Sequence, residues 1–154
     1  MSVVVSLKDV VEAMDFQSDE LTKYLNRRTG EIVAVTGEDR HLAENNELDV
    51  ARLSDWQRES VLKAREILDS GDFVPLPDKF EIHEWAIMER FAISQTARSI
   101  RTELINAIHG RGAYRMFKDT MRRLGVEESW FAFRETAFED IAKDWLEEHG
   151  IDYK

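Results

Sequence analysis

The chain contains no cysteine among its 154 residues, which excludes disulfide scaffolds, thiolate metal sites and cysteine nucleophiles. Only two prolines are present, Pro75 and Pro77, and both lie near the middle of the chain. No apolar run approaches the ~20 residues that a membrane-spanning helix needs. Residues 1–6 lack the basic start and the length of a signal peptide. From these absences we expect a cytoplasmic protein that does not bind a membrane.

The composition is that of a globular protein with a substantial core. Hydrophobic residues make up 43% of the chain and include four tryptophans and eight phenylalanines. The length suits a single domain, residues 1–154, because domains usually run to about 100–200 residues. The formal net charge of -10 disfavours non-specific binding to DNA or to anionic membranes.

The N-terminal part predicts a helix followed by a β-hairpin. Ser6, with Asp9 three residues later, favours a helix start, so we expect a helix over residues 7–14. Two strand-like runs at residues 20–25 and 31–36 flank a turn that contains Gly30. Strands are expected only between residues 20 and 36, and the polar residues 37–49 are expected to form a mobile surface loop.

Helical patterns dominate the rest of the chain. Ser54 and Gln57 suit a capping box for a helix that ends at Gly71, and the prolines then favour an extended connector at residues 73–77. This connector divides an α/β part, residues 1–72, from a helical part, residues 78–154. Further helices are expected at residues 80–93, 96–108, 113–124 and 129–148. The predicted fold class is therefore α+β, mostly α: an N-terminal helix and β-hairpin followed by about five helices.

The predicted core is aromatic. Large apolar side chains recur at helical spacing in the second half, so we expect them to be largely buried. They are Trp85, Met88, Phe91, Phe117, Phe133 and Trp145. Phe131 and Phe138 belong to the same pattern, which could also offer base-stacking surfaces, although a core role is the more common one.

A basic segment stands out within this acidic chain. Between residues 90 and 123 there are two acidic residues, Glu103 and Asp119, and eight basic ones: Arg90, Arg98, Arg101, Arg111, Arg115, Lys118, Arg122 and Arg123. On a helix that starts at residue 111, four of these cations would fall within about 60° of one another, because successive residues are about 100° apart. We call these four residues, Arg111, Arg115, Lys118 and Arg122, the basic stripe.

Two interpretations of the basic stripe remain open. It is a surface for an anionic partner, such as a phosphate-bearing ligand, a nucleic-acid backbone or an acidic protein. Alternatively, its cations pair with the acidic last helix, whose carboxylates are Glu127, Glu128, Glu135, Glu139, Asp140, Asp144, Glu147 and Glu148. A binding surface requires the four cations to face solvent, with at most two of them paired within the chain.

Gly110, Arg111 and Gly112 precede this helix. Two glycines before a helix can expose backbone N–H groups to an anion, and a turn between two helices also needs glycine. The segment is not a Walker loop, and no strand precedes it as a dinucleotide fingerprint requires. Gly110, Arg111, Gly112, Arg115, Lys118 and Arg122 are therefore the candidate anion-binding or partner-binding residues.

No catalytic, cofactor-binding or metal-binding residue can be assigned. The four histidines do not cluster in the sequence, no HExxH motif is present, and there is no nucleophile motif. The favoured function is a small non-enzymatic binding or regulatory protein that requires no cofactor. A nucleic-acid-associated protein and an enzyme with an unrecognised site are the alternatives.

A resemblance spans nearly the whole chain. The run from Gly110 to Asp119, Gly-Arg-Gly-Ala-Tyr-Arg-Met-Phe-Lys-Asp, is followed by Trp130, by Asp144-Trp-Leu146 and by Gly150-Ile151. The pattern also includes Phe133 and, earlier in the chain, Tyr24-Leu25, Thr29-Gly-Glu31, Leu76-Pro77, Met88-Glu89 and Phe91. Together these residues resemble a bacterial protein family of unknown function. The resemblance implies a bacterial, cytoplasmic, compact protein, and it implies no activity, substrate or site residue.

Overall fold

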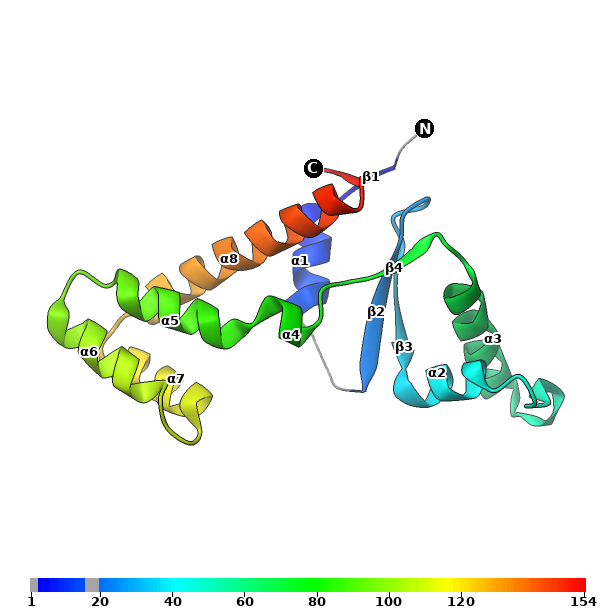
Figure 1. Cartoon of the computed structure of the whole chain (residues 1–154), viewed down its shortest axis with the longest axis horizontal. Coiled ribbons are helices and arrows are strands. Elements are labelled where there is room, and N and C mark those ends of the chain that lie inside the picture. The colour runs from blue at the N-terminus through cyan, green and yellow to red at the C-terminus, as the bar shows by residue number, and fades with distance from the viewer. Residues whose placement is uncertain (1–2, 16–19) are drawn as a thin grey trace. The chain divides into compact units, whose positions relative to one another are not determined.

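The computed structural model describes residues 3–15 and 20–154 and has an α+β, mostly α fold (Figure 1). The chain divides into two compact units. Unit 1 comprises Met1–Asp78 and Ala142–Lys154, and unit 2 comprises Lys79–Ile141. The division follows the predicted connector, but it also assigns the C-terminal residues to unit 1. The single domain stays a prediction.

Unit 1 contains short strands and three of the α-helices. In chain order its elements are β1 (Val4–Val5), α1 (Leu7–Asp15), β2 (Leu21–Asn26), β3 (Ile32–Thr36), α2 (Gly37–Glu44), the 3-10 helix η1 (Val50–Arg52), α3 (Asp55–Asp69), β4 (Phe73–Pro75) and β5 (Asp152–Tyr153). The start of α1 is as predicted, since Oγ of Ser6 accepts a hydrogen bond from the Asp9 amide at 3.2 Å.

The predicted hairpin is present and belongs to a three-stranded antiparallel sheet of order β3-β2-β4. Gly30 has φ +80°, and a Cβ there would lie 3.2 Å from a methyl group of Val3, so the turn requires glycine. The expectation that strands occur only between residues 20 and 36 was wrong. Strand β4 pairs with β2 inside the proline-containing connector, and β1 pairs in parallel with β5. Proline is tolerated in β4 because this strand lies at the sheet edge.

The expected loop at residues 37–49 is also corrected, because it begins with helix α2. Oγ1 of Thr36 caps this helix by accepting a hydrogen bond from the Asp39 amide at 3.0 Å. The predicted capping box of α3 does not form, since Ser54 stands at the N-cap without a side-chain hydrogen bond. Helix α3 ends at Asp69, just before the predicted end.

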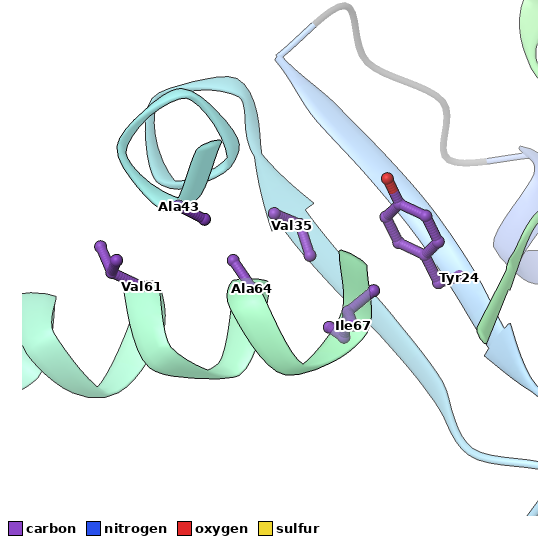
Figure 2. Packing of buried hydrophobic residues seen from close by; sticks show 6 residues of the cluster. All are labelled: Tyr24, Val35, Ala43, Val61, Ala64 and Ile67. Carbon is purple, nitrogen blue, oxygen red and sulfur yellow. The ribbon is translucent and has the colours of Figure 1, made fainter. Parts of the chain in front are cut away.

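The core of unit 1 joins the sheet to the α2–α3 pair. Figure 2 shows Val35 of β3 directed toward Ala64 of α3, and Val61 of α3 near Ala43 of α2. The cluster consists of Tyr24, Val35, Ala43, Val61, Ala64 and Ile67. Small alanines at positions 43 and 64 allow the helix backbones to approach each other and the sheet.

Unit 2 is helical. Its elements are α4 (Lys79–Ile82), α5 (Glu84–Ser94), α6 (Arg98–Ala107), α7 (Ala113–Arg123) and the larger part of α8 (Glu127–Glu148). The single helix expected over residues 80–93 is interrupted, because His83 has φ +51° and takes the left-handed conformation between α4 and α5. None of the described helices combines the length and apolar character needed to cross a bilayer.

The core of unit 2 is built around Phe91. Its ring centroid lies 6.2 Å from that of Phe117, 5.4 Å from Trp130 and 5.4 Å from Phe133. Of the predicted core residues in unit 2, Met88, Phe91 and Phe117 are buried, and Trp85 and Phe133 are half-buried. Trp145, which belongs to unit 1, is also buried. Phe131, which shares the aromatic pattern, is instead 52% exposed.

Candidate functional site

Helix α7 presents an apolar face inward and most of the basic stripe outward. Phe117, Thr120 and Met121 are buried, and the Phe117 ring lies 4.9 Å from that of Trp130 in an edge-on arrangement. Gly112 precedes the helix with φ +65°, and Gly125 follows it with φ +72°. These glycines fix the two ends of α7, because left-handed conformations are costly for other residues.

The structure places three of the four stripe residues on α7. Arg115, Lys118 and Arg122 share one face of the helix, within about 60° of one another. Arg111 lies in the preceding turn, because α7 begins at Ala113 rather than at residue 111. Arg111, Arg115 and Arg122 are exposed, and Lys118 is half-buried.

Two of the stripe residues have close partners within unit 2. Nε of Arg122 lies 3.6 Å from Oε2 of Glu127 at the start of α8, and Nζ of Lys118 lies 4.5 Å from the ring centroid of Tyr114. Within residues 3–15 and 20–154, neither Arg111 nor Arg115 forms an ion pair.

One stripe residue, Arg122, pairs with the acidic last helix through Glu127, so the alternative interpretation applies to that residue. In the described part of unit 2, no ion pair joins the stripe to Glu135, Glu139 or Asp140. Arg123, which is adjacent to the stripe, is held instead by Glu103 of α6, with Nη2 and Oε1 3.1 Å apart. Two exposed guanidinium groups thus remain at one end of the stripe, without an acidic partner among the described residues.

The glycines of the Gly110–Gly112 turn are accounted for by the backbone conformation at the start of α7. Gly112 has the left-handed conformation at the N-cap of α7 and offers no side chain to cap the first turn. A Cβ at Gly110 or at Gly112 would meet no atom within 4 Å, so both glycines border open space. Gly112 therefore leaves the backbone N–H groups in the first turn of α7 without a side-chain cap. Arg111 lies in the turn just before these groups.

Tyr114 has a polar role that the sequence pattern did not indicate. Tyr114 is exposed, and its hydroxyl donates to Oε1 of Glu84 at 3.1 Å. The same oxygen accepts a hydrogen bond from Nε of Arg134 at 2.7 Å. Glu84 thus fixes the aromatic ring that lies beneath Lys118. In the sequence, the hydroxyl that distinguishes tyrosine from phenylalanine is the feature that could have indicated this polar contact.

Two histidines that are distant in sequence share one neighbour. The rings of His83 and His109 have centroids 6.4 Å and 5.9 Å from the Trp85 ring, and the indole N–H of Trp85 donates to the carbonyl oxygen of Ile108 at 3.0 Å. Trp85 therefore lies beside two histidines that are far apart in the sequence. Among the described residues no group of three potential metal ligands comes together.

An open cavity of about 510 Å³ lies between α5 and α8. Its lining includes one cation, Arg90, and one carboxylate, Asp140, both exposed, together with Phe133. The other lining residues carry no titratable group. This cavity is the place in unit 2 where an unrecognised enzymatic site would be tested first.

No protein-family model, curated protein or solved structure matches the chain. The resemblance of the Gly110–Asp119 run to a bacterial family of unknown function stays a prediction.

Proposed function

We propose that the protein is a small non-enzymatic binding or regulatory protein that holds an anionic partner on the basic stripe. The observation that carries the proposal is the exposure of Arg111 and Arg115 without an acidic partner in the described chain. A local cluster of free cations on a chain of net charge -10 concentrates positive potential at one place.

The partner class follows from the chemistry of the stripe. Arginine forks suit carboxylates and phosphates, so an acidic protein surface or a phosphate-bearing ligand fits best. The net negative charge of the chain opposes a long nucleic-acid duplex, which makes a nucleic-acid-associated protein the second candidate. Following the sequence resemblance, we also propose a bacterial, cytoplasmic setting.

The decisive experiment reverses the two unpaired cations together, as Arg111→Glu with Arg115→Glu. Three labelled probes are titrated by fluorescence anisotropy: polyglutamate, a multiply phosphorylated peptide and a mixed single-stranded oligonucleotide pool. We expect at least one probe to bind the unaltered protein, and the double reversal to weaken that binding by about tenfold or more, which corresponds to about 1.4 kcal/mol. Stability should change little, because exposed charges contribute about 0–1 kcal/mol.

The matched control is Lys8→Glu with Arg27→Glu, which makes the same change in net charge. Both residues are exposed and belong to unit 1. If the control variant loses binding equally, the effect comes from net charge and the stripe is not the site. If the unaltered protein binds none of the probes, the proposal is wrong. Preference for the oligonucleotide pool, with strong salt dependence, would select the nucleic-acid alternative.

A further inference from the structure

The outer edge of β3 is open in the described part of the chain. Strand β3 pairs on one side with β2, and no described strand pairs on its other side. The Asn26 amide donates to the Glu31 carbonyl at 2.8 Å, and the Gly37 amide donates to the Glu20 carbonyl at 2.8 Å. Hydrogen-bonded pairs alternate along an antiparallel ladder, so Val33 and Val35 turn their backbone groups toward β2. The N–H and C=O groups of Ile32 and Ala34 and the N–H of Thr36 consequently point outward, whereas the Thr36 carbonyl accepts the first hydrogen bond of α2.

This edge lacks the usual protection against strand addition. Edge strands are commonly blocked by charged side chains, by proline or by being very short. The opposite edge of the sheet, β4, is three residues long and ends in Pro75. Strand β3 instead reads Ile-Val-Ala-Val-Thr, without charge or proline. The two edges therefore differ, because the sequence of β3 carries neither a proline nor a charged residue that would block an added strand.

A groove runs beside this edge. It has a volume of about 500 Å³ and is bounded by β3 and by one face of α3, with Asp39 from the first turn of α2. Its lining residues are Ala34, Val35, Asp39, Glu59, Ser60, Lys63 and Ala64. Figure 2 shows the floor of this region, where Val35 of β3 faces Ala64 of α3. An extended segment added to β3 would have α3 along one side, so alternate side chains would enter the groove.

An exposed tryptophan lies on α3 one turn before the helix residues that line the groove. Trp56 is 71% exposed, and it lies on the same helix face as Ser60 and Lys63, at i, i+4 and i+7. Tryptophan is enriched among the residues that contribute most to binding at protein interfaces. Its π face also attracts a Lys or Arg side chain, with an energy of about 0.5–1 kcal/mol at exposed sites.

The charge of the groove identifies the kind of segment that fits. In residues 3–15 and 20–154, Asp39 and Glu59 form no ion pair, whereas Nζ of Lys63 lies 3.7 Å from Oε2 of Glu66 and 5.6 Å from the Phe73 ring centroid. The uncompensated charge is therefore negative. A second copy of this chain would bring another Asp39, another Glu59 and a further net charge of -10 to the edge, which is repulsive.

We propose that the edge of β3 binds an extended, basic segment of another protein as a fourth strand of the sheet. The backbone of that segment would bond to Ile32, Ala34 and Thr36. A Lys or Arg side chain would lie against Trp56 and between the carboxylates of Asp39 and Glu59, and a small apolar side chain would lie over Val35 and Ala64. This surface belongs to unit 1 and is independent of the basic stripe.

The test selects binders to the full chain from a display library of random short peptides and then measures the best sequences in solution. We expect enrichment of alternating β-branched residues with Lys or Arg. On binding, the amides of Ile32, Ala34 and Thr36 should become protected from hydrogen exchange, while those of Val33 and Val35 are already protected without peptide. No enrichment, or protection elsewhere in the chain, would overturn the proposal.

Two variants make the test specific. Ala34→Pro removes an outward N–H without removing a β2–β3 hydrogen bond, so it should keep the fold and weaken peptide binding by about tenfold or more. Asp39→Asn with Glu59→Gln should keep the edge and remove the preference for basic peptides. Undiminished binding by Ala34→Pro, in a variant that still unfolds cooperatively, would show that the edge is not used. A concentration-dependent dimer that Ala34→Pro abolishes would assign the edge to a second copy and overturn the basic-peptide proposal.

The double variant Arg111→Glu with Arg115→Glu does not alter the β3 edge, so it should bind the basic peptide as well as the unaltered protein does. Loss of peptide binding in this variant would contradict the assignment of the peptide to the β3 edge. Conversely, the Ala34→Pro variant should bind the anionic probes as well as the unaltered protein does. The two proposals can therefore fail separately.

Discussion

Glu84 and Arg134, fifty residues apart in the sequence, form an ion pair whose Oε1 and Nε atoms are 2.7 Å apart. Their side chains are only 27% and 18% exposed. The same carboxylate oxygen accepts the hydroxyl of Tyr114, and the guanidinium carbon of Arg134 lies 4.1 Å from the Phe138 ring centroid. Glu84 therefore connects α5, α7 and α8 within unit 2.

Glu84→Ala should lower the free energy of unfolding by about 1–3 kcal/mol, because a largely buried guanidinium loses a carboxylate partner. Urea denaturation followed by circular dichroism measures the change. Glu44→Ala is the matched control, since Glu44 pairs with Arg40 at 3.2 Å on an exposed face of α2. That variant should lose no more than about 0.5 kcal/mol. Equal losses in the two variants would contradict the structural role of the Glu84–Arg134 pair.

Phe117→Ala should destabilise the protein by about 3–5 kcal/mol, because it leaves a cavity beside Phe91 and Trp130. Phe131→Ala provides the comparison, since Phe131 neighbours Trp130 in sequence but is exposed. It should cost less than about 1 kcal/mol. Thermal and urea unfolding measure both variants. A larger loss for Phe131→Ala than for Phe117→Ala would show that the core of unit 2 is assigned wrongly.

Tyr153 should ionise at a higher pH than free tyrosine. Its hydroxyl donates to Oε1 of Glu147 at 2.8 Å, and this hydrogen bond raises the pKa of Tyr153, with smaller contributions from desolvation and from the charges of Glu147 and Asp144. A raised pKa means that the fold favours the protonated phenol. The stabilisation is therefore complete below the ordinary tyrosine pKa and is lost as the pH rises through the folded value.

The difference in tyrosinate absorbance between the unaltered protein and Tyr153→Phe isolates this titration. Glu147→Gln should lower the pKa of Tyr153 toward its ordinary value, because a neutral amide removes the carboxylate acceptor. Glu148→Gln, one residue further along, should leave the titration nearly unchanged. Indistinguishable titrations for the unaltered protein and Glu147→Gln would rule out the hydrogen bond in solution.

Local signals in the sequence predicted the elements that a few neighbouring residues specify. The hairpin follows from two β-branched runs on either side of Gly30, and the cap of α1 follows from Ser6 and Asp9. Helix α2 could have been predicted in the same way, since Thr36 and Asp39 form a capping signal. The polar composition of residues 37–49 is typical of a loop and masks this capping signal.

Other features depend on partners that local patterns do not identify. Strand β4 needs β2 to pair with, and β1 and β5 are two residues each, too short to show a periodicity. The break at His83 interrupts a segment whose apolar pattern is continuous. In each case a tertiary contact or a single backbone conformation decides the structure, and neither is encoded in the spacing of neighbouring residues.

The candidate sites also combine features that neighbouring residues specify with features that depend on tertiary contacts. The sequence by itself determined that four cations recur at helical spacing in an acidic chain, because that spacing is a local property of residues 111–122. Only the tertiary structure decided that Arg122 pairs with Glu127 of the next helix and that, within residues 3–15 and 20–154, the edge of β3 stays open beside α3. Ion pairs and sheet edges are set by which distant elements pack together, since each charge or backbone group takes the partner that packing brings within reach.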